Sequence, residues 1–177
     1  ASGDWSSDVC SSDLLHFMLV NIWSEPYGGK STDLGIPYIT KPEKHALVDY
    51  DRGTVNEVYD KIEKDLKLGI SLVSDAYYKH PKFHFNKKAA YAFASRFYLM
   101  KGDWKAVIAY SDYVLGGDPK RMLRPWRQYA NELEFNHKNL FRRYNSTDEP
   151  ANLLMTTTES RLARTTPTEK YGSTFET

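Results

Sequence analysis

One stretch decides the fold: NKKAAYAFASRFYLMKGDWKAVIAYSDYVLGGDP, which runs from Asn86 to Pro119. Apolar residues recur there at the three- and four-residue steps that line one face of a helix. In the first half of the stretch they are Ala90, Phe93, Ala94, Phe97 and Met100. In the second half the stripe consists of Trp104, Val107, Ile108, Ser111, Val114 and Leu115. The pattern predicts two amphipathic helices whose stripes are buried.

Each half of this stretch begins and ends near residues that are common at helix ends. Asn86 and Asp103 have short polar side chains that can cap the start of each helix. Between the halves lies Gly102, and glycine adopts the left-handed backbone that commonly ends a helix. With so short a corner the helices must lie antiparallel and bury their stripes against each other, as a helical hairpin.

This hairpin resembles a tetratricopeptide unit. The resemblance rests on small residues in the first helix, the Gly102-Asp103-Trp104 corner, Ile108 and Tyr110 in the second helix, and Asp118-Pro119 at the exit. A single hairpin cannot bury both its faces, so the pattern predicts helical neighbours on either side. The expected fold class is mainly α, with tetratricopeptide-like hairpins and long irregular loops.

The segment from Gly53 to Asp75 predicts one such neighbour. Thr54 is followed by Glu57 at the capping-box spacing. A sustained apolar stripe follows, made of Val55, Val58, Ile62, Leu66, Ile70 and Val73. The stretch before this helix, Ser31 to Tyr50, contains Gly35 and two prolines, which predicts a long ordered loop.

Residues 1–14 differ from the rest of the chain. The run DWSSDVCSSDL, Asp4 to Leu14, has no helical or strand period and resembles the translation of a sequencing adapter. We therefore interpret 1–14 as an adapter-derived artefact and 15–177 as one partial helical-repeat domain. Cys10 is the only cysteine, so no disulfide or thiolate site is expected outside this run.

Composition excludes several classes of function. The net charge of the 177 residues is +1, which leaves no basic footprint for nucleic acid. His80 and His84 have the spacing of helical metal ligands, but Pro81 lies between them, so no metal is expected. Asp60 and Glu63 are expected on a solvated helix face rather than in an acid–base pair. No catalytic motif or cofactor motif was found.

The order of the parts resembles the SusD/RagB family of bacterial outer-membrane nutrient-binding lipoproteins. The matching runs are LVNIWSEPY (19–27), LGIPYIT (34–40), RGTVNEVYDKIEKDL (52–66) and the hairpin sequence 87–115. The stretch 52–115 is the most specific, and nearly all of the chain from Leu15 fits the family. A lipid-attachment start and a large C-terminal region are missing, so the chain is expected to be an internal fragment.

The resemblance implies a binding protein rather than an enzyme. Members of the SusD/RagB family are lipid-anchored at the cell surface in the outer membrane. They hold an oligosaccharide or another nutrient and act with a SusC-like TonB-dependent transporter. The alternative is an intracellular tetratricopeptide-type adaptor that binds peptide segments, and a helical-hairpin enzyme comes third. A lipoprotein signal in the full-length gene would separate the first two.

Sugar capture requires a flat aromatic face beside hydrogen-bonding groups. High aromatic content, with 13 Tyr and 4 Trp, fits such a role. The candidate platforms are Trp126 and Tyr144, in sequence expected to be irregular, with Arg127, Arg143 and Asn145 as hydrogen-bonding neighbours. The competing interpretation is structural: Trp126 wedged under the loop after Pro125, and Tyr144 filling a gap between helix and loop.

Overall fold

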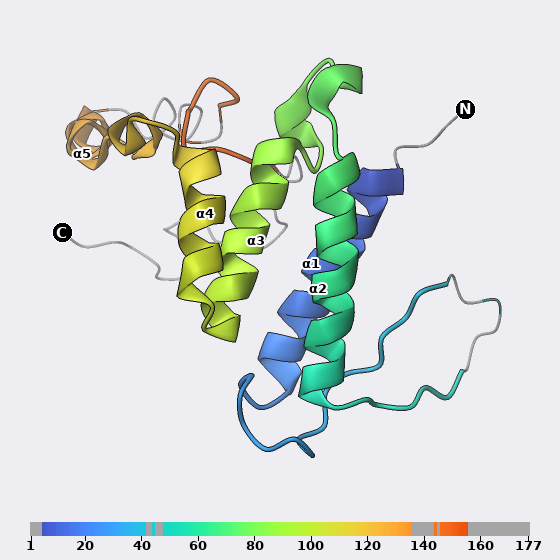
Figure 1. Cartoon of the computed structure of the whole chain (residues 1–177). Coiled ribbons are helices and arrows are strands. Elements are labelled where there is room, and N and C mark those ends of the chain that lie inside the picture. The colour runs from blue at the N-terminus through green and yellow to red at the C-terminus, as the bar shows by residue number, and fades with distance from the viewer. Residues whose placement is uncertain (1–4, 42–43, 45–47, 136–143, 145, 156–177) are drawn as a thin grey trace, which may run out of the picture.

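The computed structural model consists mainly of α-helices joined by loops, and it describes residues 5–41, 44, 48–135, 144 and 146–155 (Figure 1). Its α-helices are α1 (Trp5–Trp23), α2 (Val55–Leu72), α3 (Lys87–Lys101), α4 (Trp104–Leu115) and α5 (Trp126–Phe135). Short 3-10 turns connect them: η1 (Asp75–Tyr77), η2 (Pro81–Phe83) and η3 (Pro119–Met122). In these described residues the only β pairing is an isolated bridge between Leu34 and Thr54. The predicted fold class, mainly α with long irregular loops, is confirmed.

Helices α3 and α4 form the predicted hairpin and lie side by side in Figure 1. The side-chain oxygen of Asn86 accepts a hydrogen bond from the backbone N–H of Ala89 at 2.9 Å, which caps α3. Gly102 has a φ of +81°, the left-handed conformation that the corner was expected to need. The carboxylate of Asp103 then accepts from the N–H of Ala106 at 3.0 Å and caps α4.

The expected stripe of α4 is only partly buried. Val114 lies in the interior and Val107 packs against the core, but the side chains of Trp104 and Ile108 are 65% and 62% exposed. Met100, expected in the stripe of α3, is also exposed. A helix that contacts one neighbour buries a narrow strip, so a wide apolar stripe leaves its outer edge in solvent. The expectation that Trp104 and Ile108 pack in the hairpin seam was wrong.

Helix α2 begins as its sequence predicted. The side-chain oxygen of Thr54 accepts from the backbone N–H of Glu57, and the carboxylate of Glu57 accepts from the N–H of Thr54, which together make the capping box. Gly35 in the preceding loop lies so close that an added Cβ would be 2.8 Å from the carbonyl oxygen of Thr54. The loop is therefore held against the start of α2.

Aromatic rings fill the space where α1, α2 and α3 meet. Phe17 packs edge-on to Phe93 at a centroid distance of 5.5 Å, and Tyr59 lies 5.4 Å from Phe97. All four side chains are buried. Burying a large aromatic ring contributes about 2 to 3 kcal/mol, so this cluster is a main source of stability.

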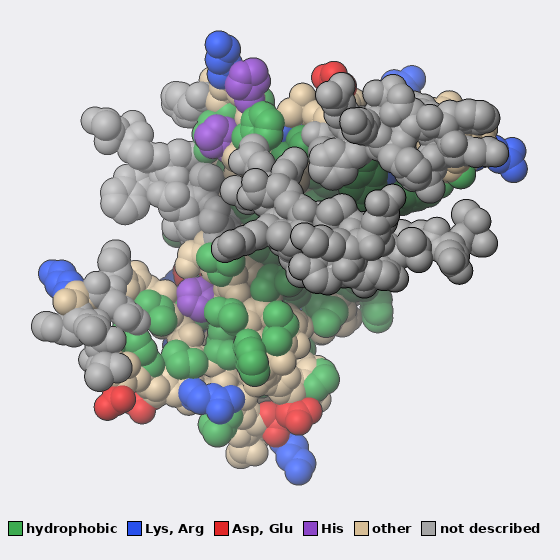
Figure 2. Space-filling view, turned by 180° about the vertical axis from the view of Figure 1, so that it is seen from behind, with side chains coloured by type: hydrophobic (Ala, Val, Ile, Leu, Met, Phe, Trp, Pro, Cys, Tyr) green, Lys and Arg blue, Asp and Glu red, His purple; other side chains and the backbone are tan. Residues whose placement is uncertain are grey.

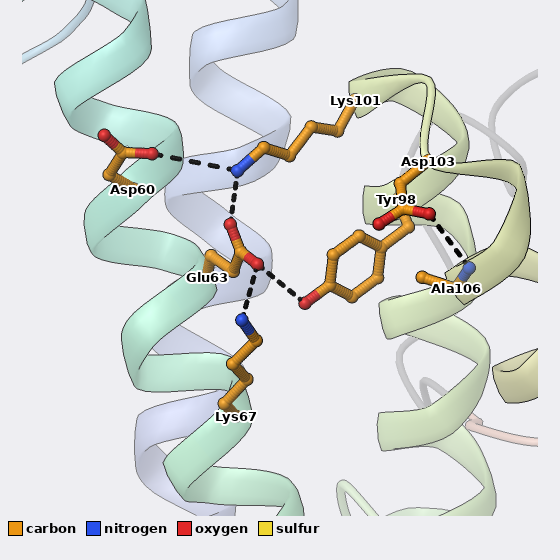
Figure 3. A network of polar contacts seen from close by, with 7 residues as sticks. All are labelled: Asp60, Glu63, Lys67, Tyr98, Lys101, Asp103 and Ala106. Atoms are coloured by element: carbon orange, nitrogen blue, oxygen red, sulfur yellow. Dashed lines mark hydrogen bonds and ion pairs between the residues drawn. The ribbon is translucent and has the colours of Figure 1, made fainter.

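Glu63 joins α2 to α3 through a polar network (Figure 3). Its carboxylate accepts hydrogen bonds from Lys101 and from the hydroxyl of Tyr98, and it pairs with Lys67 at 2.7 Å. Lys101 also lies 3.7 Å from Asp60. Glu63 is therefore half-buried against a neighbouring helix, whereas the sequence had placed it on a solvated face.

Helix α1 begins at Trp5, so residues 5–14 are helical although their sequence predicted no regular structure. Once Leu15 and the residues after it are helical, each further residue adds a hydrogen bond at little entropic cost. No glycine or proline interrupts that run. Asp13 is buried and Leu14 packs against the core. Helical structure does not test the adapter origin of residues 1–14, which stays a prediction.

The outer side of α1 is apolar and exposed. Figure 2 shows hydrophobic side chains gathered on the lower half of the face opposite to that of Figure 1. Exposed apolar residues recur along α1 at helical spacing: Leu15, Met18, Leu19, Ile22 and Trp23. Within the described ranges, no helix has both the length and the apolar character that crossing a membrane requires.

Candidate functional site

The structure brings Trp126 and Tyr144 together. Trp126 is the first residue of α5, so the irregular backbone expected there is wrong for this residue. Its indole lies 6.4 Å from the ring of Tyr144, with the ring planes inclined at 44°. The two side chains are 63% and 41% exposed, respectively. Trp126 is therefore an open aromatic surface and is not wedged in the interior, as the structural interpretation had it.

Arg124, which the sequence analysis did not select, is the arginine that contacts this pair. Its guanidinium carbon lies 3.9 Å from the centroid of the Tyr144 ring, a cation–π distance. The same guanidinium donates to the backbone oxygen of Tyr144 at 3.4 Å and to the side-chain oxygen of Asn152. Arg124 therefore covers one face of Tyr144 and leaves Trp126 as the freer platform.

The other three predicted site residues have different outcomes. Arg127 lies in the first turn of α5 and is exposed. Arg143 and Asn145 fall outside the described residues. The only sequence signal that could have identified Arg124 is its position before Pro125, because a residue before proline is extended and separates from the helix that follows.

Tyr129 supports the platform from beneath. It lies one turn after Trp126 on α5, and the two rings meet edge to face at a centroid distance of 5.9 Å and an angle of 87°. Tyr129 is buried, and its hydroxyl donates to the carboxylate of Glu149, which is also buried. This hydrogen bond, together with burial, raises the pKa of Tyr129 and keeps its hydroxyl protonated.

The segment 146–155 fixes this cluster to the start of α3, beside which it runs in Figure 1. The side-chain amide of Asn86, the N-cap of α3, donates to the backbone oxygen of Leu153 at 2.6 Å. Lys82 donates to the backbone oxygen of Glu149 at 2.8 Å, and its own backbone oxygen accepts from Met155 at 2.7 Å. These bonds join residues about 70 positions apart, so the platform is held on the helical scaffold.

The described residues of the site offer an exposed aromatic surface. Within the described residues no group of three or more His, Cys, Asp and Glu side chains is placed to hold a metal ion. His84, one of the two histidines weighed as ligands, is instead stacked on Tyr78 at 4.2 Å. A half-open indole beside hydrogen-bonding groups is suited to stacking on a planar or ring-shaped ligand.

Comparison with known proteins identifies the family. Residues 11–99, half of the chain, match a family model, SusD-like, that is described as starch-binding and associating with the outer membrane. The match begins within the adapter-like run and ends near the close of α3. No curated protein matches the chain.

Solved structures agree with that match. A SusD superfamily protein from Bacteroides thetaiotaomicron is 25% identical over 72% of this chain, with a TM-score of 0.59. A SusD superfamily protein from Bacteroides vulgatus is also 25% identical over 72%, with a TM-score of 0.57. A Bacteroides vulgatus protein provisionally named as sugar-binding is 28% identical over 66%, with a TM-score of 0.55. The chain spans 27%, 29% and 25% of these proteins, so it corresponds to about a quarter of their length.

The family match covers the capping box of α2, the aromatic core and most of helix α3, and α4 lies beyond it. The structural matches cover 72% of this chain and less than a third of each longer protein. The chain therefore belongs to the SusD-like family, whose model is described as starch-binding and associating with the outer membrane.

Proposed function

We propose that this protein binds a carbohydrate, with Trp126 as the stacking platform, and presents it to a SusC-like TonB-dependent transporter in the outer membrane. Family membership supports carbohydrate binding in general, and it favours this function over a peptide-binding adaptor. The observation that carries the site is the exposed indole of Trp126 beside the Tyr144–Arg124 pair.

Stacking explains how the platform would work. One face of a pyranose ring is lined by C–H groups, and it packs on an aromatic face while the hydroxyl groups point outward to polar side chains. Because Arg124 already covers a face of Tyr144, the sugar ring lies on Trp126, with Tyr144 as its flank. The hydrogen bonds beneath Trp126 hold the platform in place before the ligand arrives, which lowers the ordering cost of binding.

The direct test is titration with oligosaccharides. For the best ligand in a panel, Trp126→Ala is expected to weaken binding by about tenfold or more, since stacking on an aromatic ring contributes roughly 1 to 3 kcal/mol. Isothermal titration calorimetry measures this change. Trp104→Ala is a matched control, because Trp104 is 65% exposed on α4, comparable to Trp126 at 63%. Equal losses in both variants, or no loss at Trp126, would contradict the proposed site.

The transporter partnership and surface lipid anchor belong to the full-length protein. We expect the full-length protein to co-purify from solubilised outer membranes with a TonB-dependent transporter encoded beside it. We also expect radiolabelled palmitate to be incorporated at an N-terminal cysteine outside this chain. Recovery of the full-length protein in the cytoplasm, without lipid, would support the adaptor alternative.

A further inference from the structure

The loop between α1 and α2 is anchored near α2 by groups whose charge does not change around neutral pH. The guanidinium of Arg52 donates to the backbone oxygen of Gly35 at 2.7 Å. The backbone N–H of Gly35 donates to the oxygen of Gly53 at 2.7 Å, and the N–H of Val55 donates to the backbone oxygen of Asp33 at 2.9 Å. Arginine and backbone amides keep their protonation state at neutral and mildly acidic pH. This end of the loop is therefore a fixed anchor.

A histidine of α1 holds the same loop farther along the chain. The imidazole of His16 stacks on the ring of Tyr38 at a centroid distance of 4.2 Å, and its Nε2 atom lies 3.1 Å from the backbone nitrogen of Ile39. Its Nδ1 atom lies 2.9 Å from the backbone oxygen of Ser12. His16 is only 8% exposed, so both ring nitrogens form their hydrogen bonds within the protein.

These two contacts determine the protonation state of His16. A backbone N–H only donates, so Nε2 must accept from Ile39 with a lone pair. A backbone oxygen only accepts, so the hydrogen of the ring lies on Nδ1 and points to Ser12, whose hydroxyl oxygen is farther away at 3.4 Å. The arrangement therefore requires the neutral imidazole. An imidazolium would direct a second N–H at the N–H of Ile39, with no acceptor between the two donors.

The charged groups that face this cluster do not provide that acceptor. The carboxylates of Asp13 on α1 and Asp65 on α2 contact the hydroxyl of Tyr38, at 2.8 and 2.9 Å, rather than the imidazole. Lys61 on α2 lies 5.5 Å from the centroid of the Tyr38 ring. Burial raises the pKa of Asp13 to about 7, so this group titrates in the same range as an ordinary histidine and must be separated from it in a test.

We propose that His16 is a pH-dependent clasp, which holds the loop against α1 while the imidazole is neutral and releases the backbone after Tyr38 when the imidazole is protonated. The residue Ile39 is 37% exposed, so a small displacement brings its N–H to water and leaves no buried donor unpaired. The buried side chain of Ile36 and the anchor at Gly35 confine the opening to the far end of the loop. The clasp is independent of the carbohydrate site.

Amide hydrogen exchange followed by NMR tests the clasp in the intact chain. The protection factor of the Ile39 amide, corrected for the intrinsic effect of pH, is expected to fall about tenfold or more between about pH 8 and about pH 5. The nitrogen chemical shift of Nε2 in His16 is expected to change from that of an acceptor to that of a protonated nitrogen over the same range. The amide of Ile62, inside α2, is expected to keep its protection, which shows that the helices stay folded.

Two variants separate the histidine from the other titrating groups. In His16→Gln the side-chain oxygen can accept from Ile39 and does not titrate, so the protection of the Ile39 amide is expected to be nearly equal at both pH values. His80→Gln is the matched control, because it replaces an exposed histidine far from the loop in sequence. It is expected to leave the pH dependence at Ile39 as it is in the parent.

Three results would overturn the clasp. A hydrogen on Nε2 at about pH 8 would show that the tautomer is wrong. Undiminished protection of the Ile39 amide at about pH 5 would show that protonation does not open the loop. An equal fall in His16→Gln and in the parent would assign the opening to Asp13 or another group. If His16→Gln does not fold, the nitrogen shift and the exchange rates of the parent decide, since the clasp requires both to change together.

Discussion

Two carboxyl groups that lie between helices have opposite electrostatic surroundings. Glu63, between α2 and α3, receives hydrogen bonds from two lysines and from the hydroxyl of Tyr98 (Figure 3). Asp13, on α1, is 1% exposed; one carboxylate oxygen accepts from Tyr38 at 2.8 Å and the other has no hydrogen-bond partner. Both groups are bound by a tyrosine, but only Glu63 has cations beside it.

The difference appears in their pKa values. Burial alone would raise the pKa of Glu63, but hydrogen bonds from Lys101, Lys67 and Tyr98 outweigh it and lower the pKa to about 2. Burial raises the pKa of Asp13 to about 7; the hydrogen bond from Tyr38 opposes this, and the charge of Asp65 adds to it. Neighbouring cations, rather than the seam itself, decide whether a buried carboxyl group is charged.

The hydroxyl of Tyr38 is shared between two carboxylates. Its oxygen lies 2.8 Å from Asp13 and 2.9 Å from Asp65, yet a tyrosine has only one hydroxyl hydrogen. Each carboxylate therefore accepts only a share of one hydrogen bond, which compensates little of the burial of Asp13.

Neither basic residue next to the Tyr38 ring pairs with Asp13. His16 stacks on the Tyr38 ring at 4.2 Å, and Lys61 lies 5.5 Å from the centroid of that ring. In the described part of the chain Asp13 forms no ion pair. An uncompensated carboxyl group in a helix seam destabilises the fold when it ionises.

The largest expected effect is at Asp13. A carboxyl group whose pKa is raised by folding destabilises the fold only at pH values where it would be ionised in the unfolded chain. The destabilisation by Asp13 is therefore absent below its unfolded pKa of 3.8, and it grows as the pH rises to about 7. Asp13→Asn keeps an acceptor for Tyr38 and removes the charge. It is expected to raise the free energy of unfolding by about 3 kcal/mol at pH 8 and by little at pH 4, as measured by urea titration.

A matched control is Asp112→Asn, which changes an exposed aspartate on α4. It should leave the pH dependence of stability as it was. An Asp13→Asn protein no more stable than the parent at pH 8 would show that Asp13 reaches water or a cation.

The contribution of Glu63 to stability should depend on pH in the opposite sense to that of Asp13. Its lowered pKa contributes stability that is present above the unfolded value of 4.5 and is lost as the pH falls toward about 2. Glu63→Gln is expected to lower the free energy of unfolding by about 2 kcal/mol at pH 7, because it leaves Lys101 without its carboxylate partner. Denaturant titrations at pH 7 and pH 3 measure the change.

The loss of unfolding free energy caused by Glu63→Gln should be smaller at pH 3 than at pH 7. Glu25→Gln, at an exposed position after α1, is the control and should have little effect. A loss of the same size at both pH values would assign the effect of Glu63→Gln to packing rather than to charge.

The smallest expected effects come from removing each tyrosine hydroxyl. Tyr98→Phe should lower the free energy of unfolding by about 1 kcal/mol, because the lysines still hold Glu63. Tyr38→Phe removes the hydrogen bond that lowers the pKa of Asp13, so the pH at which stability falls should move upward. Carboxyl NMR titration follows both groups. A downward shift of the pKa of Asp13 would contradict this role of the Tyr38 hydroxyl.

Local residues allowed much of the scaffold to be predicted. The capping box of Thr54 and Glu57, the cap of Asn86 and the corner at Gly102 depend on residues within one helical turn, so the sequence reveals them directly. The candidate site was harder to predict from the sequence. The choice of Trp126 and Tyr144 as platforms stays a prediction, although their rings lie 6.4 Å apart. Arg124 was missed because its contact to Tyr144 joins residues 20 positions apart.

What the sequence determined by itself is where the helices start, stop and turn, since caps and left-handed glycines are settled by atoms close along the chain. Only the tertiary structure decided which side of each apolar stripe is covered, leaving Trp104 and Ile108 in solvent and the ring of Phe97 inside. It also decided that Glu63 would meet lysines and Asp13 would not. Burial and charge depend on residues from other helices, and no local pattern records which helix will lie alongside.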